Sequence, residues 1–113
     1  MTKIVIYHNP RCTKSRQTLA LLQERGVQPD VIEYLKKPLD AATITGLLDK
    51  LGFEPQQLVR QKEHRALGLP VTNDAQELIA RMAAHPEIIE RPIVVKGSTA
   101  RLGRPPERVL EIL

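Results

Sequence analysis

The sequence predicts an α/β fold with a mixed central sheet, and three observations lead to this prediction. A β-branched run, an amphipathic segment and a second β-branched run follow one another near the N-terminus. The middle of the chain has helical periodicity between turn residues, and the last third returns to β-branched runs around a glycine. The chain has 113 residues, the usual length of one domain. We therefore expect a single domain over residues 1–113.

The first strand is predicted over Lys3–Tyr7 (KIVIY), and Pro10 prevents its continuation in a central ladder. From about Thr13 the leucines are spaced for one buried helix face, and Arg25-Gly26 is a typical helix end. Val31–Leu35 predicts a second strand. A strand, a helix and a strand in this order predict a parallel pair with a right-handed crossover.

The middle segment, about residues 40–86, is predicted to be a helical insert. Gly52 is expected to end its first helix, and His85-Pro86 its last. The expected helices are Asp40–Leu51, Gln56–Arg60, Glu63–Leu67 and a helix capped by Asn73 or Asp74 that runs to about Ala84.

The C-terminal third predicts a hairpin and a last helix. Pro92–Lys96 and Thr99–Leu102 are two strands joined by a turn at Gly97-Ser98. Pro105-Pro106 then starts a helix over Glu107–Leu113, since proline is favoured in a first helical turn. The whole order, βαβ, helical insert, ββα, is the thioredoxin-like arrangement with extra helices between its halves.

Charge and hydropathy exclude several classes of function. Seventeen basic and thirteen acidic residues give a formal charge of +4, which describes a mixed, solvated surface. No block of Lys and Arg or aromatic stacking motif accompanies it, so nucleic acid is not an expected partner. No apolar run approaches the ~20 residues that span a bilayer, and the opening MTKIVIYHNP lacks a secretory signal. We expect no membrane partner and a cytoplasmic location.

The chain contains one cysteine, Cys12, so it forms neither an internal disulfide nor a cysteine-based zinc cluster. By residue type alone, a lone cysteine is more often a small buried apolar side chain. Cys12, however, lies among polar and cationic neighbours (NPRCTKSR), between a strand end and a helix start. The unpaired N–H groups of a first helical turn and the helix dipole lower a thiol pKa there. We therefore expect Cys12 to be a reactive thiolate.

The residues around Cys12 define which chemistry it serves. Phosphatase loops of the Cys-x5-Arg type need an arginine where this chain has Thr18, and dithiol redox proteins need a cysteine where it has Ser15. The site is therefore monothiol. Ser15 either donates a hydrogen bond to the thiolate or simply caps the helix. His8 either assists the thiolate as a nearby cation or faces solvent at the strand end.

Arginines elsewhere are candidate oxyanion ligands, because planar guanidinium groups bind such anions bidentately. Arg91 directly precedes Pro92 at the third strand, where thioredoxin-like folds place a cis proline opposite the nucleophilic cysteine. Arg104 follows the hairpin, and Arg60 lies in the helical insert. By spacing alone, each of the three arginines is more often a surface residue, and spacing does not show whether they converge. Two cations, Lys14 and Arg16, lie beside Cys12 in the sequence. We expect both to be exposed helix residues rather than ligands.

Four segments together resemble the glutaredoxin-coupled arsenate reductase family, in its shorter, chromosomally encoded branch. They are YHNPRCTKSRQTLALL, LVRQKE, LGLP and ERPIVVKGSTARLGRPPERVLEIL. The resemblance covers essentially the whole chain and implies a thioredoxin-like fold and reduction of arsenate to arsenite. It also implies that Cys12 is the nucleophile, that His8 assists it, and that Arg60, Arg91 and Arg104 bind the oxyanion.

The resemblance further implies glutathione as co-substrate and glutaredoxin as partner, with no bound metal or organic cofactor. In the implied reaction the Cys12 thiolate attacks arsenic, glutathione attacks the adduct, and glutaredoxin clears the resulting mixed disulfide. Two alternatives stay open. One is a general glutathione-linked thiol oxidoreductase, and the other is a non-enzymatic regulator related to the Spx branch of this fold. That branch typically carries a Cys-x-x-Cys switch, which this sequence lacks.

Overall fold

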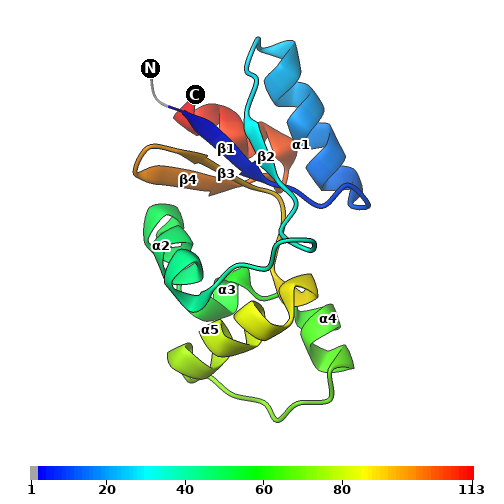
Figure 1. Ribbon diagram of the computed structural model, residues 1–113, viewed down its shortest axis with the longest axis vertical. Coiled ribbons are helices and arrows are strands. Elements are labelled where there is room, and N and C mark those ends of the chain that lie inside the picture. The colour runs from blue at the N-terminus through cyan, green and yellow to red at the C-terminus, as the bar shows by residue number, and fades with distance from the viewer. Residues whose placement is uncertain (1–2) are drawn as a thin grey trace. The chain divides into compact units, whose positions relative to one another are not determined.

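A computed structural model describes residues 3–113 and divides the chain into two compact units (Figure 1). The first unit combines the N-terminal part up to Lys37 with Arg91–Leu113, and the second is Pro38–Glu90. The second unit therefore spans the segment predicted to be a helical insert. The grouping of both units into one domain over residues 1–113 stays a prediction. Within residues 3–113, no helix is long and apolar enough to cross a membrane.

The first unit is built on a four-stranded sheet in the order β2-β1-β3-β4. β1 is parallel to β2 and antiparallel to β3, and β3 and β4 form an antiparallel hairpin (Figure 1). This confirms the predicted α/β fold with a mixed sheet. The elements of the unit are β1 (Ile4–Tyr7), α1 (Thr13–Glu24), β2 (Asp30–Ile32), β3 (Ile93–Lys96), β4 (Thr99–Leu102) and the 3-10 helix η2 (Pro106–Ile112).

One apolar cluster holds the sheet of the first unit to its helices. Ile6 of β1 lies opposite Val94 of β3 in the sheet. Both side chains pack with Leu22 of α1 and Val109 of η2, and none of the four has exposed surface. Because these residues share one cluster, α1 and η2 cover the same face of the sheet. Each such burial stabilises the fold by about 1.5–3 kcal/mol.

The second unit contains α2 (Ala41–Leu51), α3 (Pro55–Leu58), α4 (Gln61–Ala66), α5 (Ala75–Ala84) and the 3-10 turn η1 (Pro86–Ile88). Both α2 and α3 pack against α5. Local signals fix the helix ends, as predicted. Asp40 caps α2 by accepting from the Thr43 N–H at 2.8 Å, and Asp74 caps α5 by accepting from the Gln76 N–H at 2.9 Å. Gly52 ends α2 in the left-handed conformation.

The second strand is shorter than predicted, so the predicted range Val31–Leu35 is wrong. β2 covers Asp30–Ile32, and the chain turns at Glu33, whose carbonyl accepts from the N–H of Lys36 at 3.0 Å. The reason lies in the partner strand. β1 ends at Tyr7, and the His8 N–H makes the last bond to Ile32, at 2.8 Å. Beyond that point the partner offers no ladder to pair with.

Two helix boundaries in the second unit differ from the prediction. The helix predicted over Gln56–Arg60 ends at Leu58, because Val59 and Arg60 are extended. A β-bridge between Val59 and Ile89 keeps this segment extended. The next helix starts at Gln61 rather than at Glu63. In the first unit, the last helix is a 3-10 helix that begins at Pro106 and not at Glu107.

Gly103 packs closely against both Thr18 of α1 and Pro92, and this gives a test of the fold. A Cβ at Gly103 would lie 2.6 Å from Oγ1 of Thr18 and 2.8 Å from Cγ of Pro92. We expect Gly103→Ala to lower the free energy of unfolding by about 1–3 kcal/mol, because these groups must shift. Gly46→Ala is the matched control, since nothing lies within 4 Å of that Cβ inside α2. It is expected to stabilise by about 1 kcal/mol. Urea unfolding of both variants decides, and equal effects would contradict this packing.

Candidate active site

Cys12 lies at the junction between the end of β1 and the start of α1. The chain turns after Asn9, whose carbonyl accepts from the Cys12 N–H at 3.0 Å. Cys12 is extended and is the N-cap residue of α1, and its carbonyl accepts from the Arg16 N–H at 3.0 Å. The thiol is half-buried. The sequence prediction of a cysteine at a helix start is therefore confirmed in its geometry.

The surroundings of Cys12 lower the pKa of its thiol. Burial acts in the opposite direction and raises the pKa, since it disfavours the charged form. The backbone N–H of Ser15, the guanidinium of Arg91 and the backbone N–H of Lys14 together outweigh burial, and the pKa lies below that of an ordinary thiol. Because the thiolate is the nucleophilic form of cysteine, this arrangement prepares Cys12 for attack.

Arg91 and Arg104 come together beside the start of β3. The Arg91-Pro92 peptide bond is cis, as is Arg104-Pro105. The Pro92 carbonyl accepts from the N–H of Gly103 at 2.9 Å, which brings the two chain segments together. Arg104 then donates from Nη1 to the Arg91 carbonyl at 3.3 Å. The first unit therefore contains Cys12 and two of the three predicted arginines. The cis proline Pro92 directly follows Arg91.

Arg60 belongs to the second unit and is the N-cap residue of α4. Its Nε forms an ion pair with Glu63 one turn along that helix, and both side chains are about a quarter exposed, at 23% and 25%. Its extended backbone donates to the Ile88 carbonyl at 2.7 Å. The convergence of Arg60 with the other two arginines stays a prediction.

Ser15 and His8 form a buried pair under the turn that carries Cys12. The Ser15 hydroxyl lies 2.7 Å from Nδ1 of His8 and accepts from the Asn9 N–H at 3.0 Å. Ser15 has no exposed surface, and His8 and Asn9 are each 6% exposed. The hydroxyl therefore does not cap the helix, and it is the Ser15 backbone N–H that acts on the thiol.

The burial of His8 corrects one of the two interpretations of this residue. His8 does not face solvent at the strand end. Burial is the largest influence on the pKa of His8 and lowers it. The charge of Glu33 raises this pKa, and the charge of Arg16 lowers it. A lowered pKa favours the neutral imidazole at neutral pH, so the structure does not favour the other interpretation, in which His8 assists the thiolate as a nearby cation.

Asn9 is a site residue that the sequence reasoning did not select. Three of its polar groups bind the loop and the first turn of α1. Its N–H donates to the Ser15 hydroxyl, its carbonyl accepts from the Cys12 N–H, and Oδ1 accepts from the Arg11 N–H at 3.0 Å. The signal was present, since asparagine before proline is typical of a turn whose side chain binds the backbone two residues on. Lys14 and Arg16 are exposed as predicted, and Arg16 donates to the Pro10 carbonyl at 2.9 Å.

Comparisons with known proteins agree with this arrangement. The model of the ArsC family matches residues 7–112. The uncharacterised protein YfgD of Escherichia coli K12 is 53% identical over 118 residues, covering 100% of this chain and 99% of that protein. An arsenate reductase of Haemophilus influenzae is 44% identical, covering 97% and 98%. The solved structure of an arsenate reductase from Vibrio cholerae has a TM-score of 0.89 at 45% identity, covering 99% of this chain and 98% of that one.

The buried Ser15 hydroxyl predicts a large effect of a small deletion. Ser15→Ala leaves the Asn9 N–H and a His8 ring nitrogen buried without this partner. We expect a loss of about 1–3 kcal/mol in the free energy of unfolding, measured by urea titration. Thr45→Ala is the control, because that hydroxyl is exposed and binds only within α2. Its effect should stay within about 0.5 kcal/mol. Similar losses in both variants would contradict the role of the buried pair.

The Arg91 guanidinium predicts a shift in the ionisation of Cys12. Removing the cation in Arg91→Met should raise the pKa of the thiol, because the charge that favours the thiolate is gone. The rate of alkylation by iodoacetamide, followed against pH, should then rise at higher pH than in the unsubstituted protein. Arg101→Met is the matched control, since Arg101 pairs with Glu111. Superimposable pH profiles for Arg91→Met and the unsubstituted protein would contradict the assignment.

Proposed function

Because the chain belongs to the ArsC family, we propose that it is an arsenate reductase that uses Cys12 as its nucleophile. The observation that carries the proposal is the position of Cys12 at the start of α1, where two backbone N–H groups and Arg91 lower the pKa of its thiol. Relatives named arsenate reductase, at 44% identity over nearly the whole chain, support arsenate as the substrate.

Arg91 and Arg104 are the side chains that neutralise the oxyanion in this proposal. Arg91 acts on Cys12, and Arg104 is hydrogen-bonded to the Arg91 main chain. An arsenate close to the thiol would therefore meet two guanidinium groups on the same unit. Guanidinium groups suit the tetrahedral oxyanion because they donate two parallel hydrogen bonds. The family resemblance adds Arg60 as a third ligand.

The reaction proceeds in two displacements. The Cys12 thiolate attacks arsenic, an S–As bond forms, and one arsenate hydroxyl takes up a proton and leaves as water. Glutathione then attacks the Cys12 sulfur, so that an S–S bond forms and the S–As bond breaks. The electron pair of the broken bond stays on arsenic and reduces As(V) to As(III). The proton of the glutathione thiol passes to an oxygen of the departing arsenite.

An external thiol system must complete the cycle, because the chain has no second cysteine. The mixed disulfide between Cys12 and glutathione is the substrate of glutaredoxin in this proposal, and thiol–disulfide exchange returns the Cys12 thiolate. No bound metal or organic cofactor takes part. The location that fits this chemistry is the cytoplasm, where thiols are kept reduced.

The direct test is arsenite formation by the purified protein with arsenate, glutathione and glutaredoxin. Cys12→Ser should abolish it, and Arg104→Lys should lower kcat/KM by about tenfold or more, because a bidentate donor is lost. Lys50→Met, an exposed charge removal in α2, is the control and should behave as the unsubstituted protein.

Two outcomes would separate this proposal from its alternatives. Reduction of glutathione mixed disulfides without arsenite formation, at rates insensitive to Arg91 and Arg104, would favour a general thiol oxidoreductase. Absence of both activities, with recovery of RNA polymerase subunits by the immobilised protein, would favour a regulator.

A further inference from the structure

The short helix α4 has no hydrophobic anchor. None of its residues, Gln61–Ala66, all of which the structure describes, is buried. A helix of six residues is also too short to be stable by itself. Burial of apolar surface therefore does not hold α4 in place, and polar contacts to its neighbours must do so. This matters because Arg60 is the N-cap residue of this helix.

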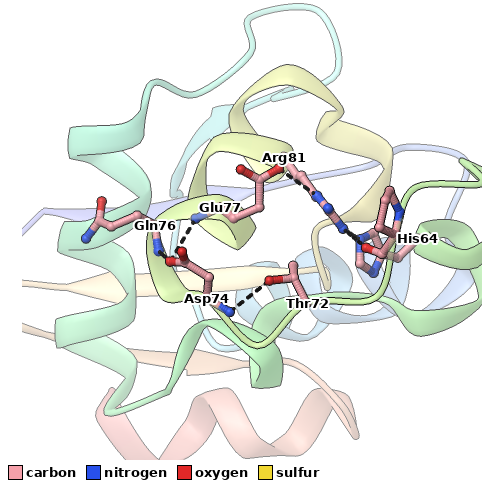
Figure 2. Close-up of polar contacts among 7 residues, drawn as sticks. His64, Thr72, Asp74, Gln76, Glu77 and Arg81 are labelled. Carbon is pink, nitrogen blue, oxygen red and sulfur yellow. Dashed lines mark hydrogen bonds and ion pairs between the residues drawn. The ribbon is translucent and has the colours of Figure 1, made fainter.

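Arg81 of α5 makes one of these polar contacts. Its side chain is 8% exposed, although it carries a full charge. Nε donates to Oε1 of Glu77 one turn earlier in α5, at 3.0 Å, and Nη1 lies 3.1 Å from Nε2 of His64 in α4. Figure 2 shows the guanidinium extending from α5 between these two partners. Since arginine has no acceptor, His64 accepts through an unprotonated Nε2.

The same guanidinium also binds the loop between α4 and α5. Nη1 donates to the Pro70 carbonyl at 2.8 Å. The far end of this loop is fixed separately, since Thr72 accepts from the N–H of Asp74, and Asp74 caps α5 (Figure 2). One buried cation therefore connects α5, the loop and α4. The cost of burying it is offset by the Glu77 carboxylate and by two neutral acceptors.

The contacts continue from His64 to Arg60. The N–H of His64 donates to the Arg60 carbonyl at 2.9 Å, and the Arg60 guanidinium pairs with Glu63 on the same helix. Any displacement of α4 therefore moves both the backbone and the side-chain partner of Arg60.

From these contacts we propose that Arg81, acting through His64, is a positioning residue that fixes α4 and thereby the direction of the Arg60 side chain. The proposal rests on the proposed function, in which Arg60 binds the oxyanion. Arg81 and His64 touch no substrate in this account. They fix the position of Arg60. A substrate-binding side chain displaced by about 1 Å can lower the rate by up to 100-fold.

The first experiment compares Arg81→Met with the control Lys50→Met in the full-length protein. Amide hydrogen exchange in α4 should become faster by about tenfold or more in Arg81→Met, because the hydrogen bonds from Arg81 to His64 and Pro70 are lost. The KM for arsenate should rise about tenfold, with kcat within about twofold, since an interaction that orients the substrate is weakened. The thiolate absorbance of Cys12 should not change, because the groups that shift the Cys12 pKa are Ser15, Arg91 and Lys14. Lys50→Met should match the unsubstituted protein.

A second pair of variants tests the same contact without removing the buried charge. His64→Gln keeps an acceptor for Arg81 and should retain a KM close to that of the unsubstituted protein. His64→Leu removes the acceptor and should reproduce the faster exchange of α4 and the higher KM. If Arg81→Met fails to fold, this pair decides the question alone.

Three results separate the possible failures. Unchanged exchange in α4 in both Arg81→Met and His64→Leu would overturn the proposal. Faster exchange with an unchanged KM would overturn the link to Arg60. If the unsubstituted protein forms no arsenite, the proposed function fails and the link to an arsenate ligand fails with it, while hydrogen exchange still decides whether Arg81 fastens α4.

Discussion

The first unit depends on how the pKa of one half-buried thiol, that of Cys12, is lowered. Burial alone would raise the pKa of the Cys12 thiol. The chain overcomes this with two backbone N–H groups at the start of α1 and with one cation, Arg91. All three must reach the sulfur at once. The end of β1, the turn after Asn9 and the start of β3 must therefore keep their relative positions for the pKa of Cys12 to stay low.

Buried hydrogen bonds and close packing supply that fixation. Beneath the sulfur, the Ser15 hydroxyl binds the turn and the His8 ring, so the loop has little freedom to move. At the other side, Gly103 lies so close to both Thr18 of α1 and Pro92 that no Cβ fits between them. Gly103 therefore lies where the segment of Arg91 and the helix that follows Cys12 both pack closely. In the second unit, the buried Arg81 likewise binds His64 of α4 and the Pro70 carbonyl.

Much of the fold could be predicted from the sequence, because its signals are local. Asp40, Asp74 and Gly52 mark helix ends through contacts with their own neighbours in the chain, and these predictions were correct. The errors occur where distant segments decide. Arg60 is extended because its strand-like segment pairs with Ile88 and Ile89, about 30 residues away in the sequence. The positions of Arg91 and Arg104 likewise depend on tertiary contacts. Sequence spacing therefore identified these arginines as candidates but did not show where they come together.

Above all, we infer that the fold itself, without substrate, lowers the pKa of the Cys12 thiol. The most direct test is the ultraviolet absorbance of the thiolate in the protein without arsenate, titrated against pH with Cys12→Ser as the blank. The account predicts a single ionisation with a midpoint below the ordinary thiol pKa of about 8.5. A midpoint at or above that value would contradict it, because burial would then outweigh the backbone N–H groups and Arg91.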